Sequence, residues 1–261
     1  MPRRRQGGLA ARLARTVVRA PLAFRLTVLG LVVVAALAAA NLAYQIARKP
    51  TELFGLVFAP APRTPSETWR RYGARFQAHA TDLIRPELLA ALAQAESQGD
   101  PLARTYWRWR WTWNPFAVYA PASSAVGLFQ MTDAAFAEGR RLCVHDHRLA
   151  RAGAWHDLSA CWLPALYART VPDHAIEMTS ARLHDHVAQA LGPSRAARVA
   201  PPRRERLAAT IHLCGPARGA ALVRQGFHVA PGERCGTHDL GAYLARVARL
   251  TLAFERLAAA P

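Results

Sequence analysis

Apolar side chains recur at helical spacing along most of the chain. The clearest pattern lies near the C-terminus, where one face of 239–258 carries Leu240, Tyr243, Leu244, Val247, Leu250, Phe254 and Leu257. Similar patterns predict helices over 67–80, 86–98, 132–142, 160–168, 180–191 and 203–214. There is no internal repeat. We therefore predict a mainly α domain over residues 67–261.

One passage has the period of a strand. Over residues 106–113 tryptophans alternate with polar residues, which predicts a small β-flap with its indoles on one face. Aromatic rings stack on sugars and guanidinium groups bind carboxylates, so this flap, with Trp109 in it, suggests a platform for a glycan strand. The alternative is a flap that packs on the domain for stability.

The N-terminal region predicts a membrane segment. Residues 26–44 hold no charged side chain over 19 positions, enough to cross a bilayer, while residues 1–25 hold seven arginines and no acid. The arginine-rich side should stay in the cytoplasm. We expect a single-pass inner-membrane anchor over 26–47 with the rest in the periplasm. The alternative is a signal segment cleaved near Ala38–Ala40, leaving a soluble periplasmic protein.

A proline-rich segment follows the apolar stretch. Residues 48–66 contain Pro50, Pro60, Pro62 and Pro65, which is typical of a short extended linker. The globular domain would then begin near Glu67.

The net charge of +17 is concentrated at one end of the chain. Residues 1–49 carry nine positive charges and no acid, which leaves +8 for the remainder. No nucleic-acid motif accompanies this charge, so we expect no nucleic-acid partner. A modest positive excess suits a polyanionic partner such as the carboxylate-bearing peptide stems of peptidoglycan.

Four cysteines lie in the part expected to be exported, and they are Cys143, Cys161, Cys214 and Cys235. An even number in an oxidising compartment indicates disulfides. Of three possible pairings we predict the local one, 143–161 and 214–235. Zinc binding with nearby histidines is the rival interpretation, but no Cys-x-x-Cys or His-Glu-x-x-His spacing occurs, so we expect neither a metal nor another cofactor.

The helix predicted over 86–98 carries an acidic side chain near its end. Leu89, Leu92 and Glu96 lie at i, i+3 and i+7, so the carboxyl shares the leucine face. Desolvation and the negative end of the helix dipole would favour the protonated acid at neutral pH, as a general acid requires. The alternative is a structural glutamate that caps a helix or pairs with an arginine.

A small-residue loop at 121–132 runs into an apolar turn with one amide side chain. The segment around Glu96 reads Ala-Glu-Ser-x-Gly-Asp-Pro, and the loop reads Ser-x-Ala-x-Gly-Leu-Phe-Gln. These two motifs, in this order, resemble those of the soluble lytic transglycosylases, whose catalytic domain is lysozyme-like. The resemblance covers residues 81–131 well.

The resemblance implies roles for individual residues. Glu96 would be the catalytic acid and base, and Ser97 would help to hold the sugar or Glu96. A glycine in the second motif lets the backbone approach a sugar, and its glutamine offers a donor and an acceptor. The substrate-binding residues would be Ser124, Gly127, Leu128, Phe129, Gln130, Met131 and Gly215, with Trp109 from the flap. The alternative for the loop is an ordinary turn into a helix.

The third motif departs from the family. Residues 211–216 read Ile-His-Leu-Cys-Gly-Pro where the family has Ala-Tyr-Asn-Ala-Gly-Pro, so His212 stands for a tyrosine that lies near the catalytic carboxyl. An imidazole can hydrogen-bond a carboxyl and titrates near neutral pH, so we expect His212 to be a second catalytic residue with a pH-dependent effect. The alternative is a core histidine.

The resemblance implies a lysozyme-like, mainly helical domain that cuts the bond between N-acetylmuramic acid and N-acetylglucosamine and leaves 1,6-anhydro ends. Only Glu96 is well placed, because Asp100 and Asp133 are weak candidates for a second carboxylate. The expected partners are peptidoglycan glycan strands, the inner membrane and cell-envelope machinery. The alternatives are a muramidase that admits water and a non-catalytic peptidoglycan-binding or secretion-assembly protein.

Overall fold

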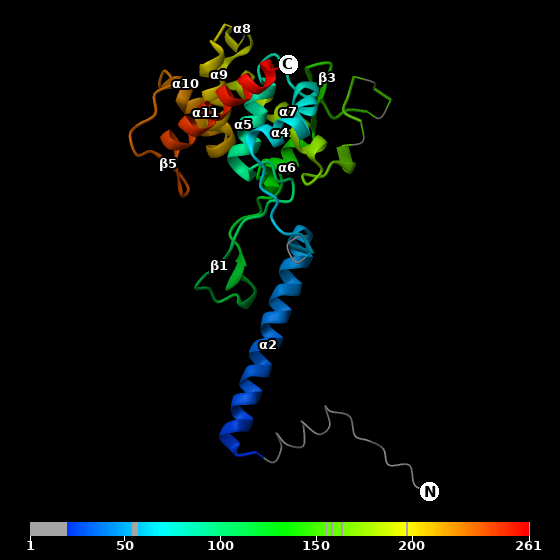
Figure 1. Ribbon diagram of the computed structural model, residues 1–261, viewed down its shortest axis with the longest axis vertical. Coiled ribbons are helices and arrows are strands. Elements are labelled where there is room, and N and C mark those ends of the chain that lie inside the picture. Colours follow the sequence, from blue (N-terminus) through cyan, green and yellow to red (C-terminus); the bar gives the residue numbers. More distant parts are fainter. Residues whose placement is uncertain are drawn as a thin grey trace. The chain divides into compact units, whose positions relative to one another are not determined.

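The computed structural model describes residues 20–53, 57–154, 156–157, 159–162, 164–196 and 198–260. Residues 1–19 of the expected cytoplasmic segment, residues 54–56 of the expected linker and Pro261 lie outside this set. The described residues fall into two compact units (Figure 1). The first joins the residues up to Glu52 with Trp107–Pro121, and the second holds the rest.

The first unit contains one long apolar helix, α2 (Leu22–Arg48), followed by the short 3-10 helix η1 (Pro50–Leu53). The helix is long and apolar enough to cross a membrane, which a signal segment also satisfies. It extends beyond the uncharged stretch 26–44 at both ends, because apolar residues precede that stretch and no helix breaker follows until Pro50.

The predicted flap is a short antiparallel hairpin in the same unit. Strand β1 (Trp107–Trp109) pairs with β2 (Tyr119–Pro121) and places Trp109 opposite Tyr119. The strand is shorter than the alternating pattern over 106–113, because beyond it the pairing continues through one bond at each end, from Arg110 N to Val118 O and from Ala122 N to Tyr106 O. The 3-10 helix η2 (Pro115–Ala117) then turns the chain back.

The second unit is mainly α, as predicted. Its longer helices are α4 (Pro65–Ala78), α5 (Pro86–Ser97), α7 (Pro172–Leu191), α9 (Pro201–Cys214), α10 (Pro216–Arg224) and α11 (Leu240–Ala259). Its shorter elements are α6 (Asp133–Gly139), η3 (Pro164–Leu166) and α8 (Pro193–Ala196), with hairpins β3–β4 (Leu142–His145, Arg148–Arg151) and β5–β6 (Arg234–Cys235, His238–Asp239).

Helix α5 is the centre of this unit and packs mainly against α11 and α4 (Figure 1). Its residues from Leu88 to Ala93 are completely buried. A buried leucine such as Leu92 is expected to cost about 2 to 5 kcal/mol when truncated to alanine. The end of α5, which carries Glu96, is therefore held rigidly by the core.

The proline-rich linker is bound to the second unit over part of its length. Ala61 N donates to Asp100 Oδ2 at 3.2 Å, and Gln94 Nε2 donates to Arg63 O at 2.8 Å. Helix α4 starts at Pro65, behind a capping box between Thr64 and Glu67, so the domain begins slightly before the predicted Glu67. The linker is therefore not simply a spacer.

Three predicted helices needed correction. The prediction of a helix over 160–168 is wrong: its described residues hold only η3, because a disulfide fixes Cys161. The predicted helix over 132–142 ends at Gly139 and gives way to β3. Helix α7 starts at Pro172 rather than near residue 180, because its first turns bury polar side chains such as Glu177 that hide the apolar pattern.

Both predicted disulfides are present. Cys143 pairs with Cys161 over 18 residues, and Cys214 pairs with Cys235 over 21 residues. Loops of this length give a disulfide about 3 kcal/mol of stabilisation in the chain-entropy account. Together with the apolar N-terminal helix, the disulfides suggest an extracytoplasmic protein.

Candidate functional site

Glu96 stands at the end of α5 and faces a groove of about 500 Å³. Its side chain is 18% exposed, so the carboxyl reaches solvent only through this groove. Arg104 and Arg246 of α11 also line the groove, as do the linker residues Phe58, Ala59, Pro60 and Pro62. The groove therefore combines the acids Glu96 and Asp100 with two arginines.

Tyr243 makes the shortest contact with this acid. Its hydroxyl donates to Glu96 Oε1 at 2.6 Å, across 147 residues of sequence. Burial, followed by the negative charge of Glu96, raises the pKa of Tyr243 well above its usual value of 10.0. The phenol therefore keeps its proton and fixes the orientation of the carboxyl. The sequence pattern had placed Tyr243 only on the core face of the last helix.

His212 lies on the same side of the carboxyl. Its Nε2 is 3.6 Å from Glu96 Oε1, which is beyond hydrogen-bond distance. The hydrogen bond to Glu96 that was expected of His212 is thus made by Tyr243. Burial lowers the pKa of His212 below its usual 6.5, against the opposing effect of Glu96, so the imidazole is neutral at pH 7. We therefore expect the His212 imidazole to become protonated only on the acidic side of neutral pH.

A second hollow of about 200 Å³ opens beside His212. Among the predicted substrate-binding residues, it is lined by Phe129, Gln130, Met131 and Gly215. Glu96 lines the first hollow and His212 the second, and these two side chains lie 3.6 Å apart. Glu96 itself lines only the first hollow, so the second hollow lies next to the acid through His212.

The loop of the second motif is shaped by close backbone contacts. Gly127 has φ +85°, and a Cβ there would lie 2.3 Å from the Arg169 carbonyl oxygen, so only glycine fits. Ser97 Oγ donates to Leu128 O at 2.7 Å and so joins the two sequence motifs directly. Leu128 is completely buried and does not line either hollow.

Other predicted substrate-binding residues also have structural contacts. Gln130 Nε2 donates to Ala103 O at 3.0 Å and to Gly127 O at 3.2 Å, which stabilises the loop. Ser124 Oγ accepts from Asp133 N at 3.1 Å. Trp109 belongs to the other compact unit and not to the unit that holds Glu96.

Neither candidate for a second carboxylate is available for chemistry. Asp100 is buried, and its two oxygens accept from the backbone N–H groups of Ala61 and Leu102. Asp133 is paired with Arg169 at 2.6 Å. Asp100 lines the same groove as Glu96, but both of its oxygens are held by backbone N–H groups, whereas among the described residues Glu96 accepts a hydrogen bond only at Oε1, from Tyr243.

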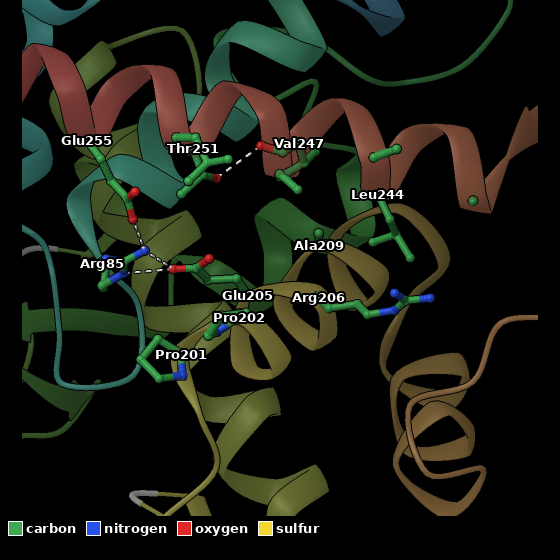
Figure 2. Close-up of a pocket in the computed structure, with 14 residues that line it drawn as sticks. Arg85, Pro201, Pro202, Glu205, Arg206, Ala209, Leu244, Val247, Thr251 and Glu255 are labelled. Carbon is green, nitrogen blue, oxygen red and sulfur yellow. Dashed lines mark hydrogen bonds and ion pairs between the residues drawn. The ribbon is translucent and has the colours of Figure 1, made fainter.

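A larger cavity, of about 620 Å³, lies between α9 and α11 (Figure 2). There Arg85 donates to Glu205 at 2.7 Å and to Glu255 at 2.6 Å. Burial raises the pKa of Glu205, and the guanidinium opposes that shift. Because both carboxyls are engaged by one arginine, this cavity offers no unengaged acid comparable to Glu96.

The chain matches no protein-family profile and no curated protein sequence. The site therefore has to be interpreted from its own geometry. Sequence reasoning located Glu96 because its motif is local, whereas Tyr243 was missed. The signal that could have found it is a phenol on an apolar helix face, because a buried hydroxyl requires a hydrogen-bond partner.

Proposed function

We propose that the second unit is a lysozyme-like peptidoglycan lytic transglycosylase with Glu96 as its acid and base. The observation that carries the proposal is a groove-facing carboxyl that Tyr243 orients, while the other carboxyl of that groove, Asp100, has both oxygens held by backbone N–H groups. Its agreement with the two sequence motifs supports the same class of reaction.

The presence of one unengaged carboxyl, that of Glu96, affects which reaction the site can catalyse. Retaining and inverting glycosidases usually need two carboxyl groups on either side of the scissile bond. A reaction in which the sugar's own hydroxyl is the nucleophile needs only one. The engagement of Asp100 and Asp133 in loop contacts and an ion pair therefore favours intramolecular ring closure over hydrolysis.

The proposed reaction consumes no water molecule. The Glu96 carboxylic acid donates its proton to the glycosidic oxygen as the bond from that oxygen to C1 of N-acetylmuramic acid breaks. The resulting carboxylate then accepts the proton of the 6-hydroxyl while that oxygen bonds to C1 and closes the 1,6-anhydro ring. Tyr243 donates to Oε1 in both steps, which leaves Oε2 to carry the proton.

The cationic groove walls suit an anionic substrate. Arg104 and Arg246 both line the groove that holds Glu96. Peptide stems attached to the glycan carry carboxylates, which guanidinium groups bind with charge-assisted hydrogen bonds. We expect these arginines to contribute to substrate affinity more than to the chemical step.

We also propose that α2 is retained as an inner-membrane anchor, with the catalytic unit in the periplasm. The helix runs without a break through Ala38–Ala40, where a cleavage site was the alternative. Its C-terminal turns contact the hairpin, and these contacts support the proposal that the helix is retained. The arginine-rich N-terminus favours the orientation.

Mass spectrometry of muropeptides tests the proposed reaction. Purified sacculi incubated with the full-length protein should release anhydro-ended fragments, lighter by one water than hydrolysed ones. Reducing ends would identify a muramidase instead, and no products at all would identify a non-catalytic binding protein.

A pair of variants on α5 tests the residue. Glu96→Gln keeps the shape but cannot donate a proton, so activity should fall by about 10³- to 10⁴-fold, near the upper end for general acid catalysis. Glu87→Gln, in the first turn of the same helix, is the matched control and should keep full activity. More than a tenth of wild-type activity in Glu96→Gln would disprove the assignment.

A further inference from the structure

The hairpin at Trp107–Pro121, which we call the aromatic hairpin, carries an unusual set of exposed rings. Trp111 and Trp113 are fully exposed, and Trp109 is 75% exposed. Exposed large aromatic side chains in such a cluster usually mark a surface that contacts a partner or a membrane. The proposed glycan chemistry at Glu96 does not account for them.

The aromatic hairpin is attached to the last turns of the apolar helix α2. Asn41 Nδ2 donates to Tyr119 O at 2.8 Å, and the Gln45 side-chain amide donates to Phe116 O. The Tyr44 and Phe116 rings lie 4.8 Å apart. The hairpin and the helix belong to one compact unit, and Figure 1 shows β1 beside the C-terminal part of α2.

The position of these contacts along α2 sets their depth in a bilayer. The uncharged stretch ends at Tyr44, three residues after Asn41, which is a rise of about 5 Å along the helix. The Tyr119 backbone therefore lies near the boundary between acyl chains and headgroups. The Trp109 ring lies against the Tyr119 ring, with centroids 4.7 Å apart, so its indole lies at a similar level.

The charge of this region also suits a lipid surface. The segments 41–52 and 107–121 hold Arg48, Lys49, Arg108 and Arg110 against the one acid Glu52. Tryptophan is enriched at the membrane interface, and cations near the surface are attracted by anionic lipids. A glycan platform, the earlier interpretation of Trp109, does not explain why the hairpin is bound to the end of an apolar helix.

We propose that the aromatic hairpin inserts its tryptophans into the headgroup region of the leaflet at the C-terminal end of α2 and binds anionic phospholipids there. The hairpin thereby fixes the depth and rotation of the anchor. This inference rests on α2 being retained as an anchor, but not on the proposed catalytic activity.

A depth-sensitive fluorophore tests this inference on the full-length protein. All four native cysteines are paired in disulfides, so Trp111→Cys introduces one reactive thiol at a fully exposed position. The labelled protein is reconstituted in vesicles of phosphatidylethanolamine and phosphatidylglycerol. A nitroxide on the lipid headgroup or the upper acyl chain should quench the label strongly, and aqueous iodide should not. Replacing phosphatidylglycerol by phosphatidylcholine should weaken the lipid quenching.

Ala36→Cys, in the middle of α2, is the matched control because its label reports only whether the helix is inserted. Quenching by lipid nitroxides at Ala36 but iodide quenching at Trp111 would overturn the hairpin proposal alone. Protection of Trp111 from iodide by added glycan strands, without lipid quenching, would also overturn it and favour the glycan platform. Absence of lipid quenching at Ala36 would overturn the anchor and this inference with it, whereas muropeptide release tests the catalytic proposal separately.

Discussion

Removing the Tyr243 hydroxyl tests the geometry of the site more sharply than removing the acid. In Tyr243→Phe the ring still fills its place between α11 and α5, but Glu96 Oε1 loses the donor at 2.6 Å. A hydrogen bond to a charged group contributes about 1.5 to 3 kcal/mol. Because it orients the acid in the chemical step, we expect roughly a ten- to hundredfold loss in kcat with little change in KM.

The assay is the rate of anhydro-muropeptide release from purified sacculi at several substrate concentrations. Tyr72→Phe is the matched control, because Tyr72 is buried in the same core and its described contacts include no side-chain hydrogen bond. Urea unfolding of both variants reports whether either change destabilises the fold. If folded Tyr243→Phe had the kcat of wild type, the phenol would not orient Glu96 and our account of the site would fail.

Three further predictions concern the groove, the imidazole and one disulfide. Arg246→Gln should raise KM several-fold with kcat unchanged, whereas Arg249→Gln, one turn further along α11 and outside the groove lining, should change neither; equal KM values for the two variants would contradict the role of the groove arginine. Since burial lowers the pKa of His212 from its usual 6.5, activity should be constant near pH 7 and fall only on the acid side of that usual value as the imidazolium forms, and His212→Phe should remove that part of the pH–rate profile. The unfolding free energy should also decrease as the pH falls, because the unfolded chain binds this proton at a higher pH than the folded one. If the acid side of the pH–rate profile were unchanged in His212→Phe, His212 would be only a core residue. Replacing Cys214 and Cys235 by alanine should lower the unfolding free energy in urea by about 3 kcal/mol, and a loss well under 1 kcal/mol would show that the loop is already ordered without the bond.

The sequence predicted what depends on neighbouring residues and missed what depends on distant ones. Glu96 was identified because proline, leucine and glycine around it define one helix and one face. Tyr243 was missed because its partner lies 147 residues away, and a tyrosine on an apolar face is equally compatible with plain core packing. The prediction that His212 lies near Glu96 is confirmed. The sequence could not show that Tyr243 of α11 would place its hydroxyl closer to the carboxyl than the imidazole.

The hairpin illustrates the same limit. The alternating tryptophans predicted a flap, but the interpretation as a glycan platform depended on chemistry alone. The polar side chains Asn41 and Gln45 near the end of an apolar stretch were the overlooked signal, because amides there need partners that the bilayer cannot supply. The helix predicted over 160–168 failed for a related reason, since a disulfide and not a periodic pattern fixes that segment.

The bond between Cys214 and Cys235 also has a consequence for the order in which the protein matures. It joins the end of the helix that carries His212 to the segment just before the helix that carries Tyr243. Both partners of Glu96 are thus translated more than a hundred residues after the acid itself. If the chain is exported as proposed, a ribosome-bound or half-translocated chain holds the acid without its orienting groups. An enzyme that cuts the cell wall would then become competent only after its last helix has crossed the membrane and the disulfide between Cys214 and Cys235 has formed.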